Sequence, residues 1–231
     1  MSGQWIDLGL MDYQQAYALQ QQLVALRHHT LQDDLLLSLE HPPVYTLGKR
    51  GGMENLRVDE TFLQRHNIPV VPIERGGNIT YHGPGQAVIY PIISLKEHRL
   101  AVKEYVWILE EIMLQTAACF DVPACRDERN RGIWVGSAKM GSLGIAVRQG
   151  VSFHGLALNV NTDLRPFSWI TPCGIQDATM TSLALERGAF LCMEKVRQVL
   201  LAQCRKHLAM ALEPVPAETL YRYIKHQEHG Q

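Results

Sequence analysis

The chain lacks the features of membrane proteins, secreted disulfide-rich proteins and nucleic-acid-binding proteins. No apolar stretch is long enough to cross a bilayer, and Gln4, Asp7 and Asp12 interrupt the region where a signal peptide has its apolar core. Five cysteines at irregular spacing fit neither a disulfide framework nor a zinc site. A formal net charge of -1 gives no concentrated basic surface for phosphate backbones. We therefore expect a cytoplasmic protein with no membrane and no nucleic-acid partner.

Motifs for nucleotides and metals are also missing. Gln86 and Ala87 follow Gly83-Pro84-Gly85, so the segment has neither the Walker A lysine nor the dinucleotide fingerprint. No pair of histidines has the i,i+4 spacing with an adjacent glutamate that zinc enzymes use. We expect neither a metal nor a cofactor, and we interpret His82 and His154 as hydrogen-bonding residues of a pocket.

The periodicity of apolar residues predicts a single α+β domain over residues 1–231. Hydrophobic content of 46% and charged content of 19% are ordinary for a globular protein, and the chain has no repeat and no linker. The predicted helices are Tyr13 to His29 (capped by Asp12), Thr61 to His66, Val102 to Phe120, Leu191 to Leu212 and a short one after Pro216. The predicted strands are Leu35 to Leu39, Ile68 to Ile73, Ala87 to Ile93, Gly132 to Val135, Leu143 to Val147 and Val151 to Asn161. Without regular βαβ alternation, this order favours a mixed or largely antiparallel sheet flanked by helices.

One glycine-rich segment, Arg75 to Gln86, is hard to explain as a simple connection. Its sequence is Arg-Gly-Gly-Asn-Ile-Thr-Tyr-His-Gly-Pro-Gly-Gln. Glycine allows a backbone to approach a ligand closely, whereas a turn alone rarely needs so many polar side chains. We interpret the segment as the wall of a ligand site, with a long hairpin connection as the alternative.

Among the cysteines, Cys173 has the most distinctive surroundings. Cys119, Cys192 and Cys204 fall on the apolar faces of predicted helices, where cysteine acts as an inert hydrophobe. Proline and glycine flank Cys173 in Thr171-Pro172-Cys173-Gly174, a tight turn that can point a thiol into a cavity. A nucleophilic cysteine needs a nearby base or cation. The candidates for that role are His41, His82, His154 and Lys139, and their spacing does not choose between them.

Four segments, in order, resemble the lipoyl(octanoyl) transferases of lipoate biosynthesis. They are His41-Pro-Pro-Val-Tyr-Thr-Leu-Gly48, the segment Arg75 to Gln86, Lys139-Met-Gly-Ser-Leu-Gly144 with His154-Gly-Leu-Ala-Leu-Asn-Val160, and Pro172-Cys-Gly-Ile175. Together they span about residues 41 to 183. The resemblance implies a fold of the biotin and lipoate protein ligase type. It also implies an enzyme that moves an octanoyl group from octanoyl-acyl carrier protein to a lysine of apo lipoyl domains, those of 2-oxoacid dehydrogenase E2 subunits and of the glycine cleavage H protein.

The resemblance also implies roles for individual residues. Cys173 carries the acyl group as a thioester, and Lys139 pairs with it and shuttles its proton. The implied substrate contacts are Arg75, Gly76, Gly77, Asn78, Ile79, Thr80, Tyr81, His82, Ser142, Leu143, Gly144, Gly155, Leu156 and Ala157. Backbone N–H groups near Gly76, Gly77 or Gly174 are candidates for binding the oxyanion. Ser142 and Met180 stand where this family commonly has smaller or branched apolar residues.

Two alternatives belong to other functional classes. An ATP-dependent lipoate or biotin protein ligase of the same fold would activate its acid as an adenylate and would not need Cys173. A non-catalytic module that binds acyl carriers or lipoyl domains would form no covalent adduct.

Overall fold

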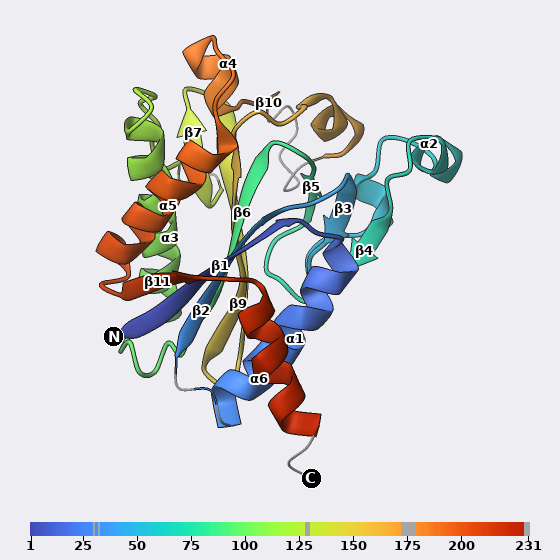
Figure 1. Ribbon diagram of the computed structural model, residues 1–231. Helices are drawn as coiled ribbons and strands as arrows, with labels where there is room; N and C mark the ends of the chain where they lie inside the picture. The colour runs from blue at the N-terminus through green and yellow to red at the C-terminus, as the bar shows by residue number, and fades with distance from the viewer. Residues whose placement is uncertain (30, 32, 128–129, 172–178, 229–231) are drawn as a thin grey trace.

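A mixed β-sheet runs through the middle of the molecule (Figure 1). The computed structural model describes residues 1–29, 31, 33–127, 130–171 and 179–228. In spatial order the strands are β10 (Thr179–Met180), β8 (Ala138–Arg148), β9 (Val151–Asn159), β6 (Gln86–Ile92), β2 (Asp34–Glu40), β1 (Ser2–Leu10) and β11 (Ala211–Val215), and β7 (Gly132–Val135) also pairs with β8. Pairing is parallel for β1 with β2 and β11 and for β10 with β8, and antiparallel elsewhere. The expected α+β class with a mixed sheet is confirmed.

Helices cover both faces of this sheet (Figure 1). On one face lie α3 (Val102–Ala118) and α5 (Met193–His207), and on the other lie α1 (Tyr13–His29) and α6 (Glu218–Glu228). Strand β2 shows how the two cores are filled, because Leu36 packs toward α3 and α5 while Leu35 and Leu37 pack toward α1. A strand buried on both faces is apolar at nearly every position. None of the helices in the described part of the chain is long and apolar enough to span a membrane.

A second, three-stranded sheet holds the glycine-rich segment. Its strands are β4 (Val70–Pro72), β3 (Val44–Leu47) and β5 (Ile79–His82), with β3 in the middle. Short helices surround it: η1 (Met53–Asn55), α2 (Glu60–Arg65) and η2 (Arg165–Trp169). Leu63 of α2 and Phe167 of η2 share a core with Tyr45, Ile79 and Tyr81. Helix α4 (Leu183–Arg187), which follows β10, is capped by Ser182, whose hydroxyl accepts a hydrogen bond from the backbone N–H of Leu185.

Asp12 caps the first helix, as the sequence predicts. Asp12 accepts hydrogen bonds from the backbone N–H groups of Gln14 and Gln15 at the start of α1. In α3 the polar Thr116 lies in the apolar stripe, where its hydroxyl donates to the carbonyl of Ile112 at 2.7 Å. The stripe is therefore compatible with burial despite this hydroxyl.

The structure departs from the predicted secondary structure in several places. The last long helix ends at His207, and Leu212 belongs to β11, where it fills the same core cluster as the helix. The segment Arg75 to Gln86 contains strand β5, paired with β3. The small-residue stretch from Gly136 to Gly144 is mostly strand, because β8 begins at Ala138. Strand β1 at the N-terminus has too many polar residues for its sequence to predict it.

The expected burial of two cysteines is also wrong. Cys119 lies at the C-terminal end of α3 and Cys192 at the N-cap of α5. Both are exposed because they lie off the buried faces of these helices, which carry Ala117 in α3 and Val196 in α5. Cys204 is buried as expected, and its burial raises the pKa of its thiol to about 12.

Candidate functional site

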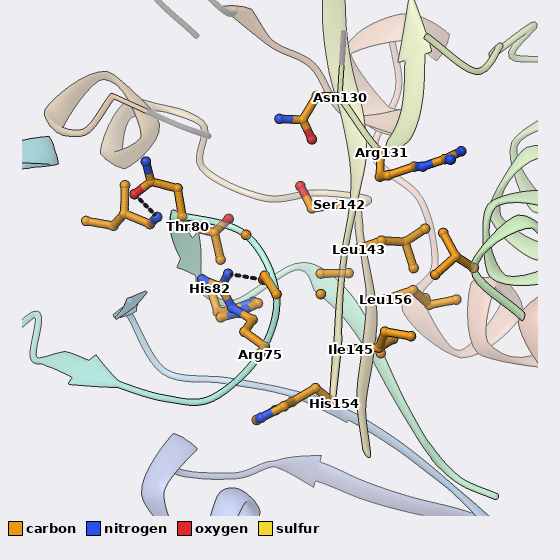
Figure 2. A pocket seen from close by; sticks show the side chains of 18 of the residues that line it. Arg75, Thr80, His82, Asn130, Arg131, Ser142, Leu143, Ile145, His154 and Leu156 are labelled. Carbon is orange, nitrogen blue, oxygen red and sulfur yellow. Dashed lines mark hydrogen bonds between the residues drawn. The ribbon is translucent and has the colours of Figure 1, made fainter. Parts of the chain in front are cut away.

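A cavity of about 790 Å³ lies between the two sheets (Figure 2). One wall comes from the segment that leads into β5, and the other comes from β8 and β9 of the main sheet. The predicted contacts Arg75 to Thr80, His82, Ser142 to Gly144 and Gly155 to Ala157 all line it, and so does Lys139. Residues about sixty positions apart in the sequence, such as Thr80 and Ser142, thus line the same cavity.

The β8–β9 wall brings two of the predicted contact segments into register. Ser142 pairs with Ala157, and Gly144 pairs with Gly155. A Cβ atom on Gly155 would lie 2.1 Å from the carbonyl oxygen of Ile89, and one on Gly144 would lie 2.7 Å from Cδ of Arg75. Gly155 therefore requires glycine, because the backbone of Ile89 approaches it too closely for a side chain, whereas a side chain at Gly144 would have to displace that of Arg75.

Arg75 is held firmly against the small sheet. Its Nη2 donates to the carbonyl of Thr46 at 2.7 Å and to the hydroxyl of Thr46 at 2.8 Å. The next residue, Gly76, donates its N–H to the carbonyl of Ile145 at 3.0 Å. This bond joins the two walls, and it uses the Gly76 N–H group that the sequence offers as an oxyanion donor. Gly174, the third candidate donor, lies outside the described residues.

Alternation along β5 divides its side chains between the cavity and the small core. Thr80 and His82 face the cavity. Tyr81 packs its ring against Tyr45 (5.6 Å between centroids) and Phe167 (5.3 Å), and burial raises the pKa of Tyr81 to about 12. Tyr81 therefore supports the wall from behind, because successive side chains of a strand point to opposite faces.

His82 presents a hydrogen-bond acceptor. Its Nδ1 lies 2.7 Å from Oε1 of Gln86, and an amide oxygen only accepts, so Nδ1 carries the proton. Nε2 of Gln86 donates to Asn159 at 2.9 Å, which fixes the orientation of that amide. Burial, the neighbouring His41 and Arg75 lower the pKa of His82 to about 3. The ring is therefore neutral at pH 7, with Nε2 as the acceptor.

His41, a candidate base in the sequence, lies behind this wall. Its Nδ1 donates to the carbonyl of Met11 at 2.7 Å, so its Nε2 accepts from the Tyr90 hydroxyl at 2.8 Å. Its ring centroid is 5.7 Å from that of His82. Both ring nitrogens are thus used, and His41 supports Tyr90, which itself lines the cavity.

Lys139 also lines the cavity, at the end away from His82, and is almost fully buried. Its Nζ donates to Oδ1 of Asn130 at 3.1 Å and lies 5.4 Å from the ring of Trp134. Gly132 leaves room for the lysine, since a Cβ atom there would lie 2.8 Å from Cε of Lys139. The surrounding turn therefore fixes the position of this amine.

Cys173 lies outside the described residues, but the chain on each side of it is anchored close to the cavity. Before it, the N–H of Thr171 donates to the carbonyl of Asn55 at 2.8 Å. After it, β10 pairs Met180 with Lys139, and the N–H of Thr181 donates to the carbonyl of Lys139 at 2.9 Å. The pairing of Cys173 with Lys139 stays a prediction.

Some cavity residues are not evident from the sequence. Tyr13, Tyr90, Asn130 and Arg131 line the cavity. Tyr13 is the first residue of α1, and the arginine-rich stretch around Asn130 has the composition of a solvated loop. Only the adjacency of Asn130 to a predicted strand could have pointed to it. Among the described residues, no group of three or more histidine, cysteine, aspartate or glutamate side chains is placed to hold a metal ion.

Comparisons with known proteins agree on one family. Residues 12–205 match the model of the lipoyl protein ligase A/B catalytic domain. An octanoyltransferase of Desulfotalea psychrophila is 52% identical over 200 residues, 85% of this chain and 90% of the relative. An octanoyltransferase of Caldicellulosiruptor bescii is 40% identical over 220 residues, 94% and 96% of the two chains. The crystal structure of a lipoate-protein ligase A bound with ATP superposes with a TM-score of 0.78 at 16% identity and covers 100% of this chain and 96% of that one.

Proposed function

Because the chain belongs to the lipoyl protein ligase A/B catalytic-domain family and is an octanoyltransferase, we propose that it works through a thioester on Cys173. The octanoyl group passes from the thioester of acyl carrier protein to the cysteine, and then to the lysine amine of a lipoyl domain. A thioester donor is already activated, so neither step needs a nucleotide.

The observation that carries this proposal is the position of Lys139. Its amine is buried in the wall of the cavity and held by Asn130, directly beside the strand that follows the Cys173 segment. An amine there can take the thiol proton as the sulfur attacks the thioester carbonyl, and then deliver the proton to the departing carrier thiolate. In the second step the substrate lysine amine attacks the cysteine thioester, and Lys139 takes the proton that the attacking nitrogen gives up. The cysteine leaves as a thiolate and takes that proton back from Lys139, which restores the thiol.

The rest of the cavity suits an acyl chain, because part of its wall is backbone without side chains. Gly76, Gly77, Gly144 and Gly155 have no side chains to block the chain, and each methylene removed from water contributes about 0.8 kcal/mol.

The partners follow from the activity. An octanoyltransferase takes its acyl group from an acyl carrier protein and gives it to lipoyl domains. More specifically, the acceptors proposed here are the apo lipoyl domains of 2-oxoacid dehydrogenase E2 subunits and the glycine cleavage H protein. The proposed location is the cytoplasm, because a reducing compartment keeps the Cys173 thiol free.

The first test is the covalent intermediate. Mixed with octanoyl-acyl carrier protein alone, the enzyme should gain one octanoyl group, which intact-mass measurement detects and peptide mapping assigns to Cys173. Cys173→Ala should abolish the adduct and the transfer. Cys119→Ala and Cys192→Ala, which remove exposed thiols, should leave both unchanged. An acyl group on another residue would contradict the assignment.

The same experiment separates the transferase from a ligase. A ligase would need ATP and Mg²⁺ and would keep its activity in Cys173→Ala, whereas the transferase should need neither. Carrier binding without an adduct would instead indicate a non-catalytic module.

A further inference from the structure

Helix α3 carries a buried carboxylate, Glu110, on the side that packs against β7 (Figure 1). Only 1% of this residue is exposed, and its neighbours Leu109 and Met113 belong to the main core. Carboxylates are almost never fully buried unless they are paired, because a charge loses its hydration in the interior. Glu110 takes no part in the proposed proton transfers, so the contacts of its two oxygens decide what it does.

The two oxygens of Glu110 face different donors. Oε1 accepts a hydrogen bond from the backbone N–H of Gly132 at 2.9 Å. Oε2 lies 3.3 Å from Nε of Arg126 and 3.7 Å from Nη1 of Arg131, and both contacts are ion pairs without a hydrogen bond. An amide at this position would turn its NH₂ group toward one of these donors, whereas a carboxylate accepts on both sides. The position therefore requires a carboxylate, and a neutral side chain of the same shape does not replace it.

Gly132 is the point at which α3 reaches Lys139. A Cβ atom on Gly132 would lie 2.1 Å from the carbonyl oxygen of Gly141 and 2.8 Å from Cε of Lys139. The φ of Gly132 is +126°, a value that glycine adopts without strain. The backbone at Gly132 thus packs directly against the lysine side chain, and any shift of this backbone displaces the lysine.

The residues just before Gly132 complete the connection. Oδ1 of Asn130 accepts a hydrogen bond from Nζ of Lys139 at 3.1 Å, and the Asn130 carbonyl accepts one from Nε1 of Trp134 at 3.2 Å. Arg131, between Asn130 and Gly132, lines the cavity. Residues 130–132 are therefore fixed by Glu110 and Trp134 on one side and hold the lysine amine on the other.

We propose that Glu110 is a positioning residue for octanoyl transfer, which holds residues 130–132 from α3 so that Asn130 keeps the amine of Lys139 in the cavity wall. This inference rests on the proposed role of Lys139 in transfer through Cys173. Glu110 does not itself line the cavity, so it acts on the reaction only through the residues that it holds.

The test is Glu110→Gln, which keeps the size of the side chain and removes its charge. In single turnovers with octanoyl-acyl carrier protein, adduct formation should slow about tenfold, because the lysine is held less firmly. The pH–rate profile should also move to lower pH, by up to about one unit, because losing a negative charge beside two arginines favours the neutral form of the Lys139 amine. Arg50 and Asp127, the other charged residues of the cavity near Arg131, are unchanged in this variant.

The matched control is Glu111→Gln, the same change at the next residue. The carboxylate of Glu111 pairs with Arg126 at 2.6 Å and is more accessible than that of Glu110. This variant should keep the wild-type rate and pH profile. Glu110→Asp keeps the charge but is one methylene shorter, so it should slow the reaction without moving the profile, and it replaces the glutamine variant if that one does not fold.

A double-mutant cycle separates positioning from a general loss of stability. If Glu110 and Asn130 both act through Lys139, Glu110→Gln combined with Asn130→Ala should be slowed little more than either single variant. Independent effects would instead multiply to about a hundredfold and would contradict the proposal. Wild-type rates and pH profiles in the glutamine and aspartate variants would also overturn it. If the wild-type enzyme forms no octanoyl adduct at all, the proposed function fails instead.

Discussion

At the scale of single residues, the position of the Lys139 amine depends on a neighbouring turn. Asn130 accepts a hydrogen bond from Nζ of Lys139 at 3.1 Å, and its own carbonyl accepts one from Nε1 of Trp134 at 3.2 Å. In the proposed mechanism Asn130 is a positioning residue, because its contact is with Lys139 and not with the reacting atoms. Lys139 has further interactions, so removing Asn130 should weaken the arrangement without abolishing it.

We expect Asn130→Ala to slow adduct formation about tenfold, since a proton acceptor loses efficiency when it is not held in place. Asn130→Asp should shift the pH–rate profile to higher pH, because a nearby negative charge favours the charged form of the lysine. The matched control is Asn67→Asp, which adds the same charge at an exposed position. A profile that does not shift in Asn130→Asp would refute the positioning role.

Two glycines of the cavity should respond differently to alanine. Gly155→Ala places a methyl group 2.1 Å from the carbonyl of Ile89, a backbone atom that cannot move aside, so we expect a loss of about 3 kcal/mol or more. At Gly76 the same methyl group would be 3.7 Å from the carbonyl of Ile145, an ordinary contact. Gly76→Ala should keep the melting temperature and raise KM for the acyl carrier. Equal melting temperatures for both variants would contradict the steric argument.

At the scale of secondary structure, the small sheet supports the chain that leads to Cys173. The hydroxyl of Tyr45 on β3 donates to the carbonyl of Pro166 in η2 at 2.6 Å, and Tyr81 on β5 packs against Phe167 of η2. Residue 172 follows η2 by only three positions. The small sheet therefore holds η2, the last described element before the Cys173 segment.

Tyr45→Phe tests this connection. It removes one buried hydrogen bond and leaves the Pro166 carbonyl without this partner, which should cost about 1–2 kcal/mol of unfolding free energy. Octanoyl transfer should fall severalfold because η2 is held less firmly. Tyr105→Phe is the control, since it removes a buried hydroxyl that bonds Ser152 at 3.2 Å in the main core. If both variants lose stability and transfer equally, η2 has no special role.

The apolar period of the sequence predicts the helices well and the strands less well. The stripes of α1 and α3 could be read directly because one face of each helix packs on the sheet. Leu212 continues the four-residue spacing of α5 but lies in β11, and both places bury it in the same cluster. Spacing reports burial and does not report the backbone that achieves it.

Strand β5 is not evident from the sequence, for a different reason. Its polar Thr80 and His82 face the cavity and not solvent, so the alternation that marks a strand is hidden among glycines. The segment Arg75 to Gln86 could nevertheless be predicted as a ligand wall, because its glycines have no turn to explain them and its polar groups cap no helix. The contacts on β8 and β9 were implied only by the family resemblance. The parts contributed by Tyr13, Tyr90 and Asn130 could not be predicted, since only the tertiary fold brings them there.

At the scale of the whole molecule, three histidines are buried where the two sheets meet. Burial lowers the pKa of His41 to about 4 and that of His82 and His154 to about 3. His41 lies just after β2, His82 on β5 and His154 on β9. Charging any of them would disturb the contact between the sheets. Arg75, itself buried nearby, further lowers the pKa of His82 and His154.

These histidines should make the fold sensitive to mild acid. The pKa of each is lower in the folded chain than the ordinary value of about 6.5, so between pH 6.5 and about 4 the unfolded chain binds more protons. Their contribution to stability is complete above pH 6.5 and is lost as the pH falls through this window. Each should remove roughly 1 kcal/mol of unfolding free energy by pH 5.5.

Thermal melts from pH 8 to pH 4.5 measure this effect. The melting temperature should fall below pH 6.5, and His154→Asn should fall less steeply because one buried titrating ring is gone. His66→Gln, which removes an exposed histidine, should follow the wild-type curve. A His154→Asn curve parallel to that of the wild-type enzyme would mean that this imidazole becomes charged in the folded state at little cost. The folded protein would then hold a charged imidazole beside the buried Arg75, and burial would not be the reason for the acid sensitivity.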